Sequence, residues 1–208
     1  MFQHRLTRPL AVAFALITAC TSVAPPASNA LAVDVLRELP TQTYALRPGD
    51  ASLGFSVKPF GFPRVRGTFD HFDGTVRVID SATDGINVEA VVDLDTIKMG
   101  SDWYENVVKG PVWFDVENHP QATFSGALEQ LDKDGEGSVV GEITIRGVTK
   151  PAEFFIRLNC EVREPCPIDA VGFTGEIEVD RTEFGMRSYR GFVGDRVRLQ
   201  FSGALISE

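Results

Sequence analysis

Apolar and polar residues alternate one by one through most of this 208-residue chain. In INVEAVVDL, every second residue from Ile86 to Leu94 is apolar, so one side of an extended strand would be apolar. The pattern recurs in LGFSVKPF, in RVRGTF and near residues 139–145, 154–158, 173–179 and 197–201. A period of two residues predicts β-strands that each bury one face. We expect about eight antiparallel strands, joined by turns such as the Asp-Gly pairs that begin at Asp73 and Asp134.

Strands with one apolar face form either two packed sheets or one sheet that closes into a barrel. Gly67, Gly141 and Gly175 fall on the apolar faces of their strands. A glycine at such a position permits a sharp bend of a barrel strand or leaves space inside for a ligand. Both effects favour an all-β, antiparallel barrel.

One segment, GSDWYENVVKGP, departs from the alternation. Ser101 is a candidate N-cap, Asp102 and Glu105 fall in the first turn, and Gly110-Pro111 would end the helix. The segment predicts one short helix in an otherwise β chain. The aromatic stretch PVWFDVENHP that follows is expected to pack across the end of the sheet.

The first 32 residues are typical of an export signal and a tether. Arg5 and Arg8 precede an apolar run, residues 10–19, that is too short to span a bilayer as a stable helix. ITAC at residues 17–20 resembles a bacterial lipobox, which would make Cys20 the first mature residue and a lipid attachment point. The alternative is ordinary cleavage near ALA, residues 30–32. We expect an exported, periplasmic protein, either a membrane-anchored lipoprotein or a soluble one, with a linker at 33–42 and the folded domain at 43–208.

The chain has three cysteines, and an exported protein seldom leaves one unpaired. Cys160 and Cys166, in CEVREPC, are close enough to form a disulfide across a short loop in an oxidising compartment. Cys20 is then the odd cysteine, and acylation explains it. The alternative is that Cys20 is a small apolar residue of a discarded signal.

Composition and motifs argue against nucleic-acid binding, metal binding and catalysis. The formal net charge of −9 repels polyphosphate, and Arg64 and Arg66 fall on the outward, solvated face of their strand. Two histidines of the domain, His71 and His119, lack the spacing of a metal site. No nucleophile elbow and no phosphate-binding glycine loop is present in the sequence. We therefore predict a non-enzymatic protein without a cofactor or metal.

Four blocks, taken together, resemble the YceI-like family of exported bacterial proteins in order and spacing: GFPRVRGTFDHFDGTV, WFDVENHPQATF, GEITIRGVTKP and VDRTEFGM. The resemblance runs from about Tyr44 to Ser207. It implies an eight-stranded, lipocalin-like barrel that holds an isoprenoid tail, as in quinone or polyprenyl compounds. Ala51-Ser52, Pro59 and Tyr104-Glu105 depart from the family pattern towards one end of the barrel, so head-group recognition is expected to differ or to be absent.

A barrel that binds an isoprenoid needs a continuous apolar bore, since each buried CH₂ contributes roughly 0.8 kcal/mol. Inward apolar positions supply the candidate lining, and the alternative for each is ordinary core packing. The candidates are Phe55, Val57, Phe69, Val88, Val92, Phe124, Ile143, Phe154, Ile156, Phe173, Ile177 and Phe201.

Two segments are candidate mouths that would contact a ligand head group. One contains Trp103, Tyr104 and Trp113, and the other contains Arg187 and Arg190 in DRTEFGMRSYRGFVGD, with Arg181 at its start. The alternative is an exposed connection whose arginines offset nearby acids.

The function that follows is non-catalytic binding, carriage or sequestration of a long apolar isoprenoid-type lipid in the bacterial cell envelope. The alternative is a structural or interaction barrel with a filled core and no lipid ligand, which acts through its surface. The partners expected are an apolar lipid and, through Cys20, a membrane. A homodimer is compatible with the sequence, although no exposed apolar strand face requires one.

Overall fold

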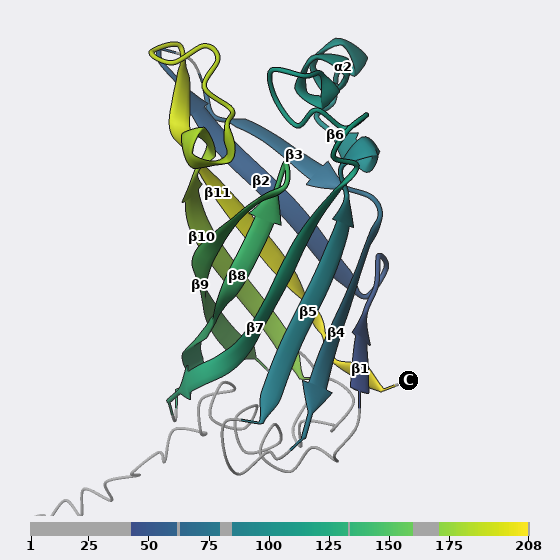
Figure 1. The fold of residues 1–208 in the computed structure, drawn as a ribbon. Helices are drawn as coiled ribbons and strands as arrows, with labels where there is room; N and C mark the ends of the chain where they lie inside the picture. Colours follow the sequence, from purple (N-terminus) through teal and green to yellow (C-terminus); the bar gives the residue numbers. More distant parts are fainter. Residues whose placement is uncertain (1–42, 62, 80–84, 133, 160–170, 208) are drawn as a thin grey trace, which may run out of the picture.

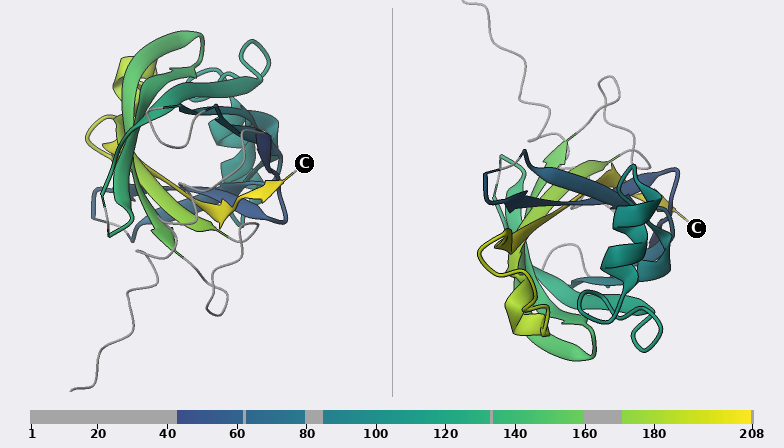
Figure 2. Two further views of the ribbon diagram at one scale, coloured as in Figure 1. Left: turned by 90° about the horizontal axis from the view of Figure 1, so that it is seen from below. Right: turned by 90° about the horizontal axis from the view of Figure 1, so that it is seen from above.

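The computed structural model describes residues 43–61, 63–79, 85–132, 134–159 and 171–207. Within these ranges the protein is an all-β fold with one α-helix, and its strands form a single curled antiparallel sheet around an interior (Figures 1 and 2). The expected signal, lipobox, tether and linker lie outside the described residues, as do Cys20, Cys160 and Cys166.

The sheet has twelve strands in the order β12-β1-β4-β5-β7-β8-β9-β10-β11-β2-β3-β6. The strands are β1 (Thr43–Leu46), β2 (Ala51–Pro59), β3 (Val65–Phe69), β4 (Phe72–Val78), β5 (Ile86–Asp93), β6 (Ile97–Lys98), β7 (Gln121–Leu131), β8 (Glu136–Ile145), β9 (Val148–Asn159), β10 (Gly172–Asp180), β11 (Val193–Ala204) and β12 (Ile206–Ser207). Two 3₁₀ turns, η1 (Leu94–Thr96) and η3 (Arg181–Phe184), and the helix α2 (Asp102–Lys109) connect them.

The prediction of about eight strands is wrong, because three long strands are each divided and the two-residue β6 is an additional strand. A turn at residues 47–50 separates β1 from β2, Asp70 and His71 separate β3 from β4, and Leu205 separates β11 from β12. Each divided strand still lies beside another divided strand over both of its parts. β3 pairs with β2 and β4 with β1, while β11 pairs with β2 and β12 with β1. Hydrogen bonds therefore link the last strand back to the first.

The expected turn at Asp73 is also wrong, because Asp73 and Gly74 lie inside β4, where they pair with Val91 and Ala90. The chain is interrupted two residues earlier, at Asp70 and His71, where β3 ends, and Phe72 starts β4. The turn at Asp134 is confirmed. There Gly135 has φ +79° between β7 and β8, a conformation that glycine adopts without steric cost.

The predicted short helix is confirmed as α2, which lies at one end of the curled sheet (Figure 1). Ser101 occupies the N-cap position, but its side chain makes no capping hydrogen bond. Glu105 instead fixes the helix to β6: its carboxylate accepts a hydrogen bond of 2.9 Å from the Met99 backbone N–H and lies 3.5 Å from Lys98 Nζ. The Met99 hydrogen bond, aided by Lys98, lowers the pKa of Glu105.

Two inward glycines are covered by aromatic rings from the neighbouring strand. Gly67 pairs with Phe55, and Gly175 pairs with Phe201, in register. A Cβ added at either glycine would overlap the partner ring. The space over these glycines is thus filled by phenylalanine rather than left for a ligand. Gly141 is required for a different reason: a Cβ there would overlap the backbone carbonyl of Ser125 in β7.

Candidate ligand cavity

The interior of the curled sheet contains a cavity of about 260 Å³. Its lining comes from strands all round the sheet, and almost every lining side chain is apolar. Along β5 it is lined by Ile86, Val88, Ala90 and Val92, and six residue steps of a strand span roughly 20 Å. The cavity is therefore long as well as apolar, a shape that suits a chain.

Eleven of the twelve candidate lining residues face this one cavity: Phe55, Val57, Phe69, Val88, Val92, Phe124, Ile143, Phe154, Ile156, Phe173 and Phe201. Ile177 does not. It is buried in the hydrophobic cluster that contains Phe184 and Met186 of the segment after β10. Period two predicted its inward direction, which its burial in this cluster agrees with, but Ile177 is not part of the cavity lining.

Several lining residues were not among the candidates. Leu53 and Ala90 have the right alternation, and the same signal that selected their neighbours would have found them. Phe72 lies next to the turn expected at Asp73, so the sequence pattern did not place it on a strand face. Phe114 belongs to the segment after α2, and its place in the wall depends on how that segment folds over the end of the sheet.

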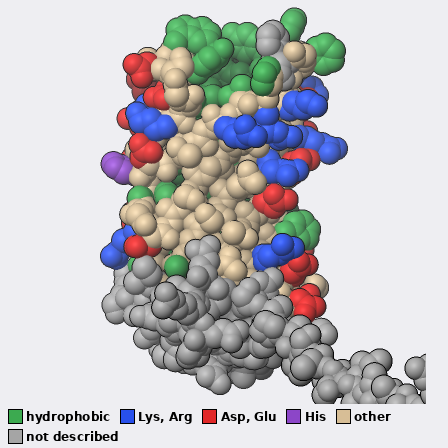
Figure 3. Space-filling view, turned by 180° about the vertical axis from the view of Figure 1, so that it is seen from behind, with side chains coloured by type: hydrophobic (Ala, Val, Ile, Leu, Met, Phe, Trp, Pro, Cys, Tyr) green, Lys and Arg blue, Asp and Glu red, His purple; other side chains and the backbone are tan. Residues whose placement is uncertain are grey.

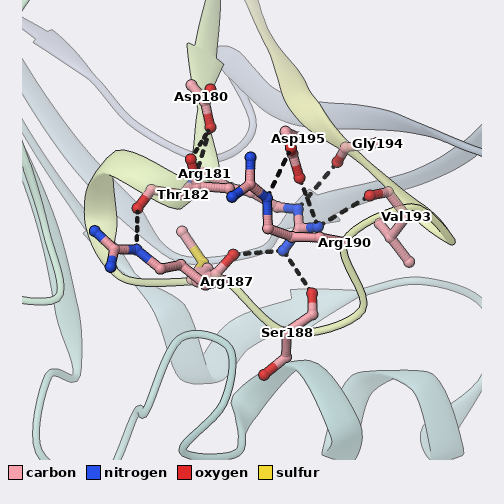
Figure 4. A network of polar contacts seen from close by, with 10 residues as sticks. Asp180, Arg181, Thr182, Arg187, Ser188, Arg190, Val193, Gly194 and Asp195 are labelled. Carbon is pink, nitrogen blue, oxygen red and sulfur yellow. Dashed lines mark hydrogen bonds and ion pairs between the residues drawn. The ribbon is translucent and has the colours of Figure 1, made fainter.

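At the α2 end of the cavity, Arg181 is buried, with 1% of its surface exposed, although its stem reaches the cavity wall. All five of its N–H groups donate hydrogen bonds (Figure 4). The acceptors are the carbonyl oxygens of Met186, Ser188 at 2.9 Å, Val193 at 2.9 Å and Gly194 at 3.0 Å, and Asp195 Oδ1 at 3.0 Å. Arg181 thus holds the loop between η3 and β11 in one conformation.

Burial lowers the pKa of Arg181, and the nearby Asp195 and Asp180 carboxylates oppose this shift. Arginine stays protonated in proteins, so the buried guanidinium remains a cation balanced by Asp195. Asp180, the N-cap of η3, accepts hydrogen bonds from the Thr182 hydroxyl at 2.7 Å and the Thr182 N–H at 2.8 Å. The hydroxyl bond chiefly lowers the pKa of Asp180. The expectation of an exposed connection is wrong for Arg181, which is buried and contributes to the cavity lining.

Trp113 lies between this loop and the cavity. Its ring stacks on Tyr189 with centroids 6.0 Å apart, and the guanidinium of Arg181 lies 5.0 Å from its centroid. Trp113 also lines the cavity, and its Nε1–H is buried without a hydrogen-bond acceptor among the described residues. A buried donor without a partner is rare in folded proteins, and a ligand oxygen could satisfy this one.

The four head-group candidates do not line the cavity. Trp103 and Tyr104, on α2, are mostly exposed, and Arg187 and Arg190 are exposed in the loop after η3. Both segments nevertheless lie at the same end of the sheet (Figure 1). These residues are therefore positioned around that end of the molecule rather than inside it.

The described residues contain no group of three or more His, Cys, Asp or Glu side chains that could hold a metal ion. His71 is exposed, and His119 precedes β7. In the described part of the chain, every helix is too short or too polar to cross a bilayer.

An all-β sheet curled around a long apolar cavity, with one helix at its end, defines a lipocalin-like protein. Residues 44–205 match the YceI-like domain, and the chain belongs to this family. A protein called UPF0312 in Yersinia pestis (strain Pestoides F) is 26% identical over 153 residues, which cover 73% of this chain and 79% of the relative.

Solved structures share the fold. BcnA of Burkholderia cenocepacia matches with a TM-score of 0.65 at 21% identity, over 74% of this chain and 95% of BcnA. A polyisoprenoid binding domain from Saccharophagus degradans, implicated in plant cell wall breakdown, matches with a TM-score of 0.62 at 12% identity. That match covers 81% of this chain and all of the domain, 100%.

Proposed function

We propose that this protein binds one long, apolar, isoprenoid-type lipid in the interior of a lipocalin-like barrel and carries or sequesters it without catalysing a reaction. The observation that carries the proposal is the elongated apolar cavity of about 260 Å³. The fold shared with a polyisoprenoid binding domain supports the same ligand class.

The energetic cost of an empty cavity supports a bound ligand. Side chains that line unfilled apolar space lack packing partners on one side, and a bound hydrocarbon chain would supply them. A filled-core protein acting through its surface would gain nothing from such a space.

The buried Nε1–H of Trp113 refines the ligand class. It favours a lipid that carries a hydrogen-bond acceptor at the end of its chain, such as a quinone carbonyl or a phosphate oxygen. The remainder of the lining would contact only the hydrocarbon. The export signal expected in the first 32 residues supports the bacterial cell envelope as the proposed site of action, with Cys20 as the proposed membrane anchor.

Native mass spectrometry of the exported protein, purified from a bacterial envelope without detergent, tests the proposal. The expected result is a discrete added mass that organic extraction releases as a polyprenyl or quinone species. A protein that is empty as purified, and that also fails to take up ubiquinone or a polyprenyl phosphate, would refute it.

A pair of neighbouring substitutions in β5 provides a matched control. Ala90→Phe places a ring in the cavity, whereas Val91→Phe places the same ring on the outer face of the same strand. The expected result is that Ala90→Phe loses the added mass and Val91→Phe keeps it. Equal retention by both folded variants would mean that the lipid is not bound in this cavity.

A further inference from the structure

Large aromatic side chains are exposed at one end of the molecule. Phe60, in the turn between β2 and β3, is 81% exposed, and Phe192, just before β11, is 75% exposed. Tyr189 of the same loop is also mostly exposed. We call Phe60, Tyr189 and Phe192 the aromatic tip. Figure 3 shows hydrophobic side chains gathered at this end of the molecule.

The aromatic tip is held in place by the protein. The Phe60 N–H donates to the Phe192 carbonyl at 2.9 Å, which joins the two segments. The N–H groups of Phe192 and Val193 both donate to the Tyr189 carbonyl, and Tyr189 itself has φ +57°, an uncommon value for a residue other than glycine. Together with the Arg181 hydrogen bonds, these contacts fix exposed rings that gain nothing from exposure to water.

Exposed cations surround the aromatic tip. Lys58, Arg64 and Arg66 lie on the β2–β3 hairpin that carries Phe60, and Arg187 lies in the loop that carries Phe192. We call these four residues the basic patch. None of them has an ion-pair partner among the residues that the structure describes, whereas the neighbouring Arg190 pairs with Asp195 at 3.2 Å. In Figure 3, Lys and Arg side chains gather next to the apolar end.

The sign of this charge is unusual for the chain. The whole sequence carries a formal net charge of −9, yet residues 58–66 contain three cations and no acid, and residues 181–195 contain three arginines and two acids, Glu183 and Asp195. Protruding aromatic rings next to unpaired Lys and Arg are the chemistry that inserts into a lipid interface and contacts lipid phosphates. A protein partner would instead require matching pockets for rings that project from turns.

We propose that the aromatic tip and the basic patch dock this protein on an anionic phospholipid membrane. The Phe60 and Phe192 rings enter the head-group region, and the basic patch contacts phosphate groups. The inference rests on the proposed function, because Tyr189 of the tip stacks on Trp113 of the cavity wall. Docking at this end therefore brings the cavity next to the source of its lipid.

Flotation of the exported full chain with phospholipid vesicles tests the docking. Cys20→Ser in every variant removes any acyl anchor at that position. The vesicles contain phosphatidylcholine alone or phosphatidylcholine with phosphatidylglycerol. The expected result is flotation with the anionic vesicles that weakens as salt concentration rises, since exposed charges are screened.

Three variants test the residues. Phe60→Ala with Phe192→Ala is expected to weaken binding by about tenfold or more. Lys58→Gln with Arg66→Gln removes two of the four cations and is expected to weaken the preference for anionic vesicles by about tenfold or more. Phe155→Ala is the matched control, since Phe155 is also an exposed phenylalanine, 63%, but lies on the outer face of β9; it should bind like the parent protein.

Lack of flotation by the parent protein, or equal flotation by the Phe60/Phe192 variant, would overturn the docking. Equal binding to neutral and anionic vesicles would overturn the role of the basic patch. Native mass spectrometry of the same proteins separates the two proposals. A protein that keeps its lipid but does not float refutes only the docking, whereas an empty protein that floats supports docking and refutes the proposed ligand.

Discussion

Replacing Arg181 by methionine should be among the most damaging single changes to this domain. The side chain is 1% exposed and donates five hydrogen bonds: two to carbonyls of the loop after η3, two to carbonyls at the start of β11, and one to Asp195. Methionine fills a similar space and supplies no donor. The change therefore leaves the carboxylate of Asp195 and the four carbonyl groups without their partner.

The expected loss follows from the burial. Removing one partner of a buried ion pair costs about 3–5 kcal/mol, and each carbonyl left buried and unpaired costs about 1–3 kcal/mol. Asp195 is 29% exposed, so water can reach part of this region and hydrogen-bond to some of the carbonyls. The full cost of four unpaired carbonyls is therefore not added to the cost of the broken ion pair. We expect a loss of about 5 kcal/mol in the free energy of unfolding. For a chain of this length, each kcal/mol lowers the Tm by roughly 2–4 °C, which gives a fall of about 10–20 °C.

Guanidinium denaturation and calorimetry of four variants measure this. Arg181→Lys retains three donors and should lose about 2 kcal/mol. Asp195→Asn keeps an acceptor oxygen and should lose about 1 kcal/mol. Arg187→Met, at an exposed arginine, should change stability by less than about 0.5 kcal/mol. If Arg181→Met lies within about 1 kcal/mol of the parent protein, the five hydrogen bonds do not hold the loop as described.

Three further predictions concern single groups. The lowered pKa of Glu105 stabilises the fold above the ordinary glutamate pKa, about 4.3, and that contribution is lost as the pH falls through the lowered value. Denaturation should be measured from about pH 6 to about pH 3, which brackets that pKa. The difference in the free energy of unfolding between the parent and Glu105→Gln should become smaller as the pH falls; a constant difference would contradict the prediction. Gly175→Ala should cost about 1–3 kcal/mol by overlap with the Phe201 ring, and Phe201→Ala in the same chain should relieve part of this cost; additive losses would show that the two do not interact. Trp113→Phe removes the unpaired buried Nε1–H, so the ligand-free protein should be as stable as the parent while lipid retention in native mass spectrometry falls; unchanged retention would show that no ligand acceptor bonds there.

The faces of the strands could be predicted from the sequence because the side chains of a strand alternate whatever the rest of the chain does. That rule placed Phe55, Val88 and Phe124 correctly on the inner side. The helix α2 could be predicted too, because its boundaries depend on nearby residues such as Gly110. The division of the long strands escaped the rule, since a two-residue interruption at Asp70 leaves the flanking pattern intact.

The groups at the α2 end could not be predicted in the same way, because their roles depend on contacts between distant segments. Arg181 has the sequence context of an exposed loop, and its burial follows from five acceptors that the folded loop brings together. Trp113 meets Tyr189 across 76 positions of the chain, a separation that no local pattern reports. Ile177 shows the converse, since a correct inward direction does not reveal whether a side chain lines the cavity or packs in a core cluster beside it.

The rings that cover Gly67 and Gly175 have an evolutionary consequence. A side chain at Gly175 would overlap the Phe201 ring, and one at Gly67 would overlap the Phe55 ring and the Lys98 carbonyl, so neither glycine can be replaced while its partner keeps the ring. Among relatives that keep this fold, a side chain at position 175 is therefore expected only where position 201 has become small. The two positions would therefore change together during evolution, and the width of the cavity would depend on such residue pairs and not on single residues.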